Sequence, residues 1–275
     1  MELSYVNGTV IPLNQAHVSL SDNGYLLGDG VFETMRTTRS GMLFRPELHA
    51  TRLVNGLEKL LLPTEGIYEK FMNTAETLRA EAVQQIGNEL YVRINISSGT
   101  SRNWAEKPEL IVTGIAKALH SKKSRPLSCI TWNHHGQLHE LSDVKSLSYA
   151  RSALLRRKVA LENIDDIILI SPDGLVVEAS TSNVIARKGN KIYAPGTLSG
   201  ALPGTTQHIL ICELLPRDEY EVVERITLDE LYECDEVLLT SSLIGVKRAL
   251  KIDSATYTET KLFDFLSEKY SKLLD

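Results

Sequence analysis

A break in the apolar pattern near the middle of the chain most constrains how it can fold. From 118 to 126 the sequence reads ALHSKKSRP, which loses apolar periodicity and gathers positive charge. Such a segment is typical of a linker, and the 275 residues of the chain exceed one typical domain. We therefore predict a small N-terminal α/β domain over 1–118, an interdomain linker over 119–126, and a larger C-terminal domain over 127–275.

The composition is that of an ordinary globular protein with a core of enzyme size, because 43% of the residues are hydrophobic and 24% are charged. The formal net charge is -5 and the basic residues are scattered, so the sequence does not indicate the basic patch that binds a nucleic acid. No stretch approaches the roughly 18 apolar residues of a membrane span. Cys129, Cys212 and Cys234 are far apart and odd in number, so we expect free thiols and a cytoplasmic protein.

Each half of the chain mixes strands with helices. In the first half we expect strands at 3–6, 9–11, 31–37, 42–45, 90–96 and 110–115, and helices at 46–62 and 68–85. In the second half we expect strands at 127–132, 166–170, 175–177, 183–187, 191–194 and 237–239. We also expect helices after Lys145, over the apolar run 209–215, and at 263–274.

Two of these strands place polar side chains on one face. With a period of two, Phe32, Thr34 and Arg36 share a face. Arg36 therefore either points inward or marks the place where the strand emerges into water. In the strand 90–96, the same period separates Arg93 and its polar neighbours from the apolar residues, which indicates a half-buried strand beside water or a cavity.

The stretch Ser142 to Arg157 places Lys145 just before an amphipathic pattern, with Leu147, Ala150, Leu154 and Leu155 at helical spacing. A lysine at a helix start would have a lowered pKa, because the macrodipole disfavours a cation there. A neutral amine is the form that makes a Schiff base. Taken by itself, the stretch fits a solvated surface lysine at least as well, so the interpretation depends on other motifs.

Two other motifs suit a phosphorylated heterocycle. Glu178 ends an apolar strand, where a carboxylate needs a partner such as a protonated ring nitrogen. Thr205 and Thr206 follow Gly204 at a helix start, and Ser241 and Ser242 end a strand, so both segments offer donors to an anion. Each segment alone is explained by a helix cap or a turn. Together with an arginine on a helix face, they predict a dianion site.

Other catalytic and metal chemistries lack support. His134, His135 and His139 lie near Glu140 and Asp143, but Gly136 interrupts them and no shared helix face is indicated, so we predict no metal site. There is no GxSxG elbow for a serine nucleophile, and a cysteine triad lacks support as well.

Taken together, the motifs resemble those of the class IV pyridoxal-phosphate-dependent aminotransferases, which include D-amino-acid aminotransferases, branched-chain aminotransferases and aminodeoxychorismate lyases. The resemblance covers almost the whole chain. Its motifs are GDGVFETMR (28–36), HATRL (49–53), YVRI (91–94), VKSL (144–147), EASTSNV (178–184), LPGTTQ (202–207) and LLTSS (238–242).

The resemblance implies a two-domain class IV aminotransferase-like α/β fold, with the cofactor between the domains and the larger C-terminal domain binding it. Lys145 would carry the cofactor as a Schiff base and move a proton in catalysis. Glu178 would pair with the pyridinium nitrogen, and Arg52 would bind the phosphate. Thr205, Thr206, Ser241 and Ser242 would assist Arg52. The family implies a homodimer whose small-molecule substrates are an amino acid and a 2-oxo acid.

The resemblance leaves the substrate open. Tyr149 is a candidate for the cofactor's 3′-oxygen, although branched-chain enzymes have their tyrosine one position later. Arg93 stands where those enzymes bind a carboxylate, and the loop with Arg102 resembles D-amino-acid enzymes. Arg36, Arg93 and Arg102, with Phe32, would favour a dicarboxylate. We expect a transaminase that favours D-alanine or D-glutamate. An aminodeoxychorismate lyase, a branched-chain L-amino-acid aminotransferase and a binding protein without turnover are the alternatives.

Overall fold

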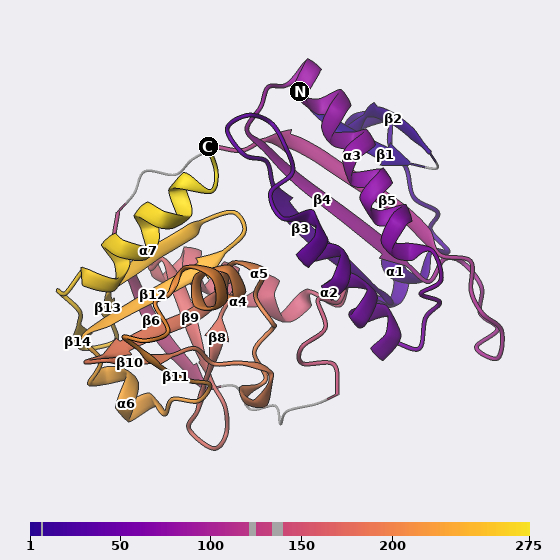
Figure 1. Ribbon diagram of the computed structural model, residues 1–275. Coiled ribbons are helices and arrows are strands. Elements are labelled where there is room, and N and C mark those ends of the chain that lie inside the picture. The colour runs from indigo at the N-terminus through magenta and orange to yellow at the C-terminus, as the bar shows by residue number, and fades with distance from the viewer. Residues whose placement is uncertain (7, 121–124, 134–139) are drawn as a thin grey trace. The chain divides into compact units, whose positions relative to one another are not determined.

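The computed structural model describes residues 1–6, 8–120, 125–133 and 140–275 (Figure 1). The chain forms two compact units, and the first comprises Met1–His120, Val144–Tyr149 and Leu274–Asp275. The second comprises Ser121–Asp143 and Ala150–Leu273. The units are therefore not continuous in sequence, whereas the predicted boundaries assume that they are. Of the predicted linker, 121–124 lie outside the described residues.

The first unit is an antiparallel sheet with two long helices on one face. The strand order is β2-β1-β5-β4-β3, so β3 is an end strand. Residues of β3 and β4 that pair in register project from the same face, and the face of Val31, Ile94 and Ile96 is the buried one. α2 packs on β3, and α3 packs on β4 and β5. The elements are β1 (Glu2–Val6), β2 (Thr9–Pro12), α1 (Asn23–Leu27), β3 (Gly30–Arg36), α2 (Pro46–Lys59), α3 (Ile67–Gln85), β4 (Leu90–Ser97) and β5 (Ile111–Ala118).

The long helices of this unit follow from the sequence pattern. Pro46 is the first residue of α2, where its missing N–H removes no helical hydrogen bond. Leu53 and Leu57 are buried on α2, whereas Leu61 lies beyond the end of the helix and is 92% exposed. The strand predicted at 42–45 is wrong, because only an isolated bridge joins Thr37 to Leu43.

The second unit is built on a mixed sheet whose described strands follow the order β11-β10-β9-β12-β13-β6-β7-β8, with β14 beside β13. β6 pairs in parallel with both β7 and β13, and the run DIILI of β7 is buried along its whole length. The strands are β6 (Leu127–Asn133), β7 (Asp166–Ile170), β8 (Val176–Ala179), β9 (Asn183–Lys188), β10 (Lys191–Tyr193), β11 (Glu221–Val223), β12 (Glu236–Ser241), β13 (Gly245–Ile252) and β14 (Ala255–Thr256). The helices are α4 (Ala150–Glu162), α5 (Thr205–His208), α6 (Leu228–Tyr232) and α7 (Lys261–Lys272).

Several segments of this unit differ from the sequence-based prediction, and β11, α6 and β14 are among those that were not predicted. The apolar run after Gln207 is a π-helical segment, Ile209–Leu214, which continues the short helix α5. β13 was not predicted, because Lys247, Arg248 and Lys251 interrupt its apolar residues. In the described part of the chain, no helix combines the length and hydropathy that crossing a membrane requires.

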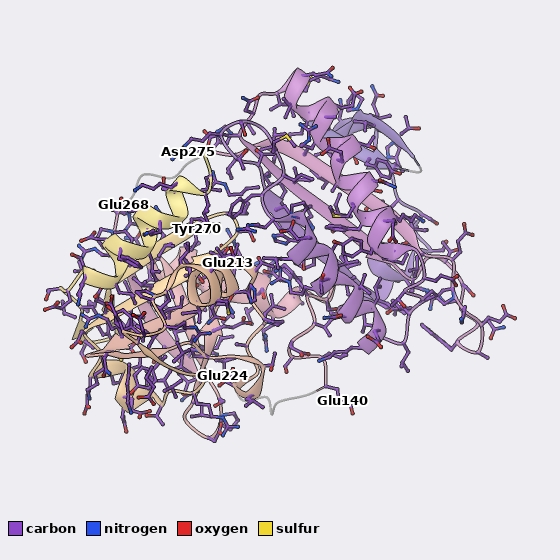
Figure 2. The ribbon with its side chains drawn as sticks, viewed as in Figure 1. Glu140, Glu213, Glu224, Glu268, Tyr270 and Asp275 are labelled. Carbon is purple, nitrogen blue, oxygen red and sulfur yellow. The ribbon has the colours of Figure 1, made fainter. Side chains whose placement is uncertain are left out.

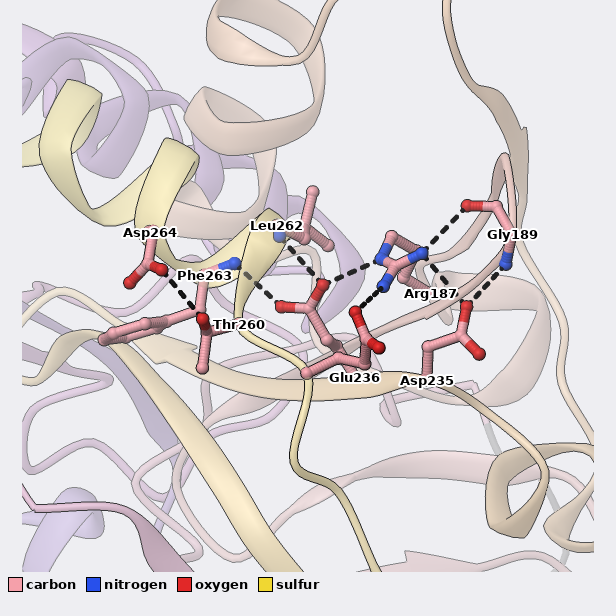
Figure 3. Close-up of polar contacts among 9 residues, drawn as sticks. Arg187, Gly189, Asp235, Glu236, Thr260, Leu262, Phe263 and Asp264 are labelled. Carbon is pink, nitrogen blue, oxygen red and sulfur yellow. Dashed lines mark hydrogen bonds and ion pairs between the residues drawn. The ribbon is translucent and has the colours of Figure 1, made fainter.

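A buried ion cluster joins α7 to the sheet (Figure 3). Glu236, which is 1% exposed, accepts hydrogen bonds from the backbone N–H groups of Leu262 and Phe263 in the first turn of α7. The Arg187 Nε also donates to Glu236, at 2.8 Å, and its Nη1 donates to Asp235 at 3.0 Å. Glu236 thus satisfies two N–H groups of the helix start and neutralises a buried arginine.

The C-terminal end of α7 packs through an aromatic ring. Tyr270 of α7, labelled in Figure 2, is 3% exposed. Gly245 of β13 has a φ of 63°, and a Cβ there would lie 3.3 Å from the Tyr270 ring. The glycine therefore permits both the backbone conformation and the close approach of the helix.

Replacing Glu236 by alanine is expected to lower the free energy of unfolding by about 3 kcal/mol or more, because Arg187 loses its buried partner and α7 loses its cap. Urea denaturation of the purified variant measures this loss. Glu259→Gln is the matched control, since Glu259 contacts the same arginine at 3.6 Å but its side chain is 63% exposed. Equal stability of the Glu236 variant and wild type would contradict this role.

Candidate active site

Backbone pairing with the edge of the first sheet positions Lys145. The Phe32 N–H donates to the Lys145 carbonyl at 2.9 Å, and the Leu147 N–H donates to the Gly30 carbonyl at 2.9 Å. Between these bonds, Val31 and Ser146 form an antiparallel bridge. Lys145 therefore lies in a segment that pairs with the outer edge of β3.

The predicted helix start at Lys145 is wrong. α4 begins at Ala150, so Lys145 lies outside its first turn, and the macrodipole argument for the pKa of the amine does not apply. The predicted apolar stripe is also only partly buried. Leu155 is buried, but Ala150 is exposed and Leu154 is 50% exposed.

The glycine motif at 28–30 allows this pairing. Gly30 has a φ of 144°, a backbone conformation that residues with a side chain rarely adopt. A Cβ on Gly30 would lie 2.2 Å from the Ile96 carbonyl oxygen and 2.9 Å from the Leu147 side chain. Only a residue without a side chain therefore lets the Lys145 segment and β4 flank the start of β3.

Four predicted site residues come together in the first unit. Lys145, Arg93 and Tyr149 lie around the ring of Phe32. The Lys145 Nζ lies 4.7 Å from the centroid of the Phe32 ring, and the Arg93 Cζ lies 3.7 Å from it. The Tyr149 ring meets Phe32 edge-on, with the centroids 5.2 Å apart. The structure thus brings Lys145, Tyr149, Phe32 and Arg93 together. Each of the two cations, Lys145 and Arg93, is attracted electrostatically to the negative face of the Phe32 ring.

On the other face of β3, Glu33 holds two residues of α2. The Arg52 Nε and Nη2 donate to the two Glu33 oxygens, each at 2.7 Å, and the His49 Nδ1 lies 2.6 Å from Glu33 Oε2. Glu33 is completely buried, and the Arg52 side chain is 10% exposed. The carboxylate therefore fixes the orientation of the guanidinium by a bidentate pair.

The charge states in this group follow from burial and pairing. Burial alone would raise the pKa of the Glu33 carboxyl, but the charge and hydrogen bonds of Arg52, together with His49, hold that pKa well below its usual range. Burial lowers the pKa of the His49 imidazole, and the attraction of Glu33 does not overcome this. We therefore assign a neutral imidazole whose Nδ1–H donates to the ionised Glu33.

In the second unit, Glu178 is tied to the turn before α5. Its Oε2 accepts a hydrogen bond from the Leu202 N–H at 3.1 Å, and the Asn183 Nδ2 donates to the Leu202 carbonyl at 2.7 Å. A Cβ at Gly204 would lie 2.0 Å from the Asn183 Oδ1, so the turn requires glycine there. The predicted carboxylate and the predicted phosphate-binding segment are thus joined through Leu202 and Asn183.

The hydroxyl groups predicted to bind an anion also come together. The Thr205 Oγ1 at the start of α5 lies 3.3 Å from the Ser242 Oγ, just after β12. Thr240 pairs with Asn183 in the sheet, so both side chains project from the face that bears the Leu202–Gly204 turn. The Thr240 hydroxyl is buried and has no hydrogen-bond partner among the described residues.

Sequence reasoning missed one acidic residue that orders this region. Asp166 is 8% exposed and accepts hydrogen bonds from the hydroxyl groups of Ser180 and Ser182 and from the Ser180 N–H. It thereby holds the loop that directly follows Glu178. The only sequence feature that marks Asp166 is a carboxylate just before the apolar residues of a strand. The same feature occurs at many other places in the chain, so it does not single out this residue.

The other predicted arginines lie apart from the Phe32 cluster. Arg36 pairs with Glu89 at 3.4 Å, near the end of β3 where it lies opposite Tyr91. Arg102 is exposed in the loop after β4 and has no ion pair within the described residues. Their roles in binding substrate stay predictions, as do the roles of Thr206 and Ser241. The histidines His134, His135 and His139 lie outside the described residues.

Comparison with known proteins gives the family. Residues 30–252 match the family model of the class IV aminotransferases. An aminodeoxychorismate lyase of Bacillus subtilis is 28% identical, over 92% of this chain and 87% of its own length. A D-alanine aminotransferase of Bacillus licheniformis is 25% identical, over 91% of this chain and 88% of its own.

A solved structure has the same fold. The PLP-bound form of a hypothetical aminotransferase from Mycobacterium tuberculosis superposes with a TM-score of 0.86 at 21% identity, over 100% of this chain and 99% of that one. The predicted two-domain class IV aminotransferase-like α/β fold is therefore confirmed. The chain is an enzyme of the aminotransferase class. It belongs to the class IV aminotransferase family.

The neutral, buried His49 gives an expected pH dependence. An imidazole whose pKa is lowered by folding binds its proton more readily in the unfolded chain, so stability is lost as pH falls below the unfolded pKa of about 6.5. When the pH is lowered from 7 to 5, the free energy of unfolding of the His49→Gln variant is expected to fall by about 1 kcal/mol less than that of wild type. Urea unfolding at both pH values measures this difference.

The matched control is His17→Gln, because His17 is exposed. Its stability is expected to follow the wild-type dependence on pH. If the His49 variant shows the same loss between pH 7 and pH 5 as wild type, the assignment of a neutral, buried His49 is incorrect.

Proposed function

We propose that this enzyme is a pyridoxal-phosphate-dependent transaminase that moves an amino group between an amino acid and a 2-oxo acid. The observation that carries the proposal is the cluster on Phe32, where the Lys145 amine and the Arg93 guanidinium contact one ring. A transaminase needs an amine as nucleophile and a cation for the substrate carboxylate. Membership of the class IV family supports the same reaction.

The donor set of the second unit fits pyridoxal phosphate. Glu178 supplies a carboxylate for a protonated ring nitrogen. Thr205, Thr206 and Ser242 supply hydroxyl groups for a phosphate, and the buried Thr240 hydroxyl has no partner among the described residues. When bound, pyridoxal phosphate supplies an aldehyde that captures amines and a ring that accepts electrons.

When pyridoxal phosphate is bound, the Lys145 Nζ would be the nucleophile that anchors it and would then serve as the base at the substrate. In that role the amine would take up the proton from the substrate Cα. Backbone pairing with β3 keeps the amine at the Phe32 ring through both steps. Tyr149, edge-on to the same ring, is proposed to contact the 3′-oxygen of the cofactor.

Two charged residues would hold the ends of the cofactor. The Glu178 carboxylate would keep the ring nitrogen protonated, and the hydrogen bond that this carboxylate accepts from the Leu202 N–H orients it. Arg52, oriented by Glu33, is proposed to bind the phosphate. Thr205, Thr206, Ser241 and Ser242 are proposed to complete the phosphate site.

For the substrate we propose an acidic or small amino acid, with D-glutamate and D-alanine favoured. Arg36, Arg93 and Arg102 are the candidate carboxylate ligands, and Phe32 forms the apolar wall. Arg93 has no carboxylate partner among the described residues, whereas Glu89 pairs with Arg36. We also propose that the enzyme works as a homodimer in the cytoplasm.

Two alternatives remain within the family. Similarity to the Bacillus subtilis lyase favours an aminodeoxychorismate lyase, which releases pyruvate and 4-aminobenzoate. A branched-chain L-amino-acid aminotransferase is the second, because Arg93 stands in the motif YVRI.

The reaction itself can be followed by absorbance. The holoenzyme is expected to be yellow, and D-alanine or D-glutamate is expected to shift its spectrum towards the pyridoxamine form. The L-enantiomers are the controls for stereochemistry. If neither enantiomer of alanine or glutamate changes the spectrum while aminodeoxychorismate yields pyruvate, the enzyme is a lyase and the transaminase proposal fails.

Lys145→Ala is expected to abolish turnover, because no other described lysine contacts the Phe32 ring. Lys158→Ala is the matched control, since Lys158 also contacts an aromatic ring, that of Trp132 at 4.0 Å, but lies on α4. Borohydride reduction followed by peptide mapping is expected to find the cofactor on Lys145. An adduct on another side chain would refute its role.

Glu178→Gln is expected to retain the cofactor but to lower kcat roughly 10²-fold or more, because a neutral amide does not hold the ring nitrogen protonated. Cofactor content and steady-state rates measure the two effects. The control is Glu162→Gln, at an exposed position near the end of α4. Wild-type rates in the Glu178 variant would show that this carboxylate has another role.

A further inference from the structure

The face of the first sheet opposite α2 and α3 carries a row of polar side chains beside Phe32. In the strand register, Phe32 of β3 lies opposite Asn95 of β4, and Asn95 lies opposite Thr113 of β5. Arg93 lies two residues before Asn95 and opposite Thr34. Paired residues project from the same face of a sheet, so these side chains share the face opposite α2 and α3.

Hydrogen bonds connect three of these side chains in a chain. The Arg93 Nε donates to the Asn95 Oδ1 at 2.7 Å, and the Asn95 Nδ2 donates to the Thr113 Oγ1 at 3.3 Å. The guanidinium of Arg93 has only donors, so the amide oxygen of Asn95 must face it. That requirement turns the amide nitrogen towards Thr113 and fixes one orientation of the amide.

The arrangement holds the Arg93 guanidinium in place without neutralising it. One edge of the group is occupied at Nε, and one face lies 3.7 Å from the Phe32 centroid. Its two terminal nitrogens have no hydrogen-bond partner within the described residues. A guanidinium fixed in this way presents its terminal donors for a bidentate contact with a carboxylate.

Arg52 in the same unit shows the opposite arrangement. Its Nε and Nη2 are both occupied by the carboxylate of Glu33, which neutralises the charge. Asn95 takes the corresponding place beside Arg93, but an amide is neutral. A carboxylate at position 95 would fix the guanidinium equally well and would compete with any anionic ligand.

We propose that Asn95 and Thr113 are positioning residues, which aim the Arg93 guanidinium at a carboxylate of a 2-oxo acid or amino acid substrate. The inference rests on the proposed transaminase function. Because the flexible arginine is ordered before the substrate arrives, binding does not have to order it. The two residues act on substrate affinity through Arg93 and take no part in proton transfer.

The test is the dissociation constant of 2-oxoglutarate for the holoenzyme, measured by calorimetry alongside kcat and KM. Asn95→Leu is expected to raise the dissociation constant and KM about tenfold and to change kcat by less than about twofold. Asn95→Asp is expected to weaken binding as well, because it neutralises Arg93. Thr113→Val is expected to raise the dissociation constant about threefold, whereas Thr113→Ser, which keeps the hydroxyl, stays near wild type.

A double-mutant cycle separates positioning from general damage to the sheet. Arg93→Gln alone is expected to weaken binding strongly, and adding Asn95→Leu to it is expected to cause little further loss, because Asn95 acts through Arg93. Asn55→Leu, at an exposed position of α2, is the control. Thermal midpoints and the absorbance of the bound cofactor check that each variant folds and binds the cofactor.

The outcomes distinguish this inference from the proposed function. If Asn95→Leu binds 2-oxoglutarate as wild type does while wild type transaminates, the positioning role is refuted and the function stands. Additive losses in the double variant would refute it in the same way. If wild type neither binds 2-oxoglutarate nor transaminates any amino acid, both proposals fail.

Discussion

The backbone pairing of the Lys145 segment with the edge of β3 is the interaction on which the candidate site depends. β3 ends the first sheet, so its outer edge offers N–H and carbonyl groups that need partners. The segment Val144–Tyr149 supplies them and belongs to the first unit although its chain neighbours belong to the second. The nucleophile is therefore placed by two main-chain hydrogen bonds, and the rigidity of the sheet is transmitted to its side chain.

The first unit uses its arginines in two different ways on the two faces of β3 and β4. Glu33, on the helix-covered face, binds Arg52 by both oxygens and orients its guanidinium. Asn95, on the opposite face, orients Arg93 with a neutral group. A buried carboxylate and an amide differ by one charge, and that charge decides how strongly each guanidinium attracts a further anion.

The second unit orders its polar segments through side chains that bond to backbone. Asp166 holds the loop after Glu178, and Asn183 holds the Leu202 carbonyl in the turn before α5. Glu178 completes this network by accepting the Leu202 N–H. The carboxylate and the hydroxyl groups of α5 thus share one framework, so a change in the turn would move both.

The family, the α/β class and the long helices follow from the amino-acid sequence, because local periodicity and motif order specify them. The same is true of the face of β4 that carries Arg93 and Asn95. Which residues contact one another depends on the folded arrangement. The pairing of Val144–Tyr149 with β3, the contact of Glu33 with Arg52, and the bond from Arg93 to Asn95 depend on sheet register and strand order. The helix expected at Lys145 was wrong for the same reason, since this segment pairs with the edge of β3 and the helix begins only at Ala150.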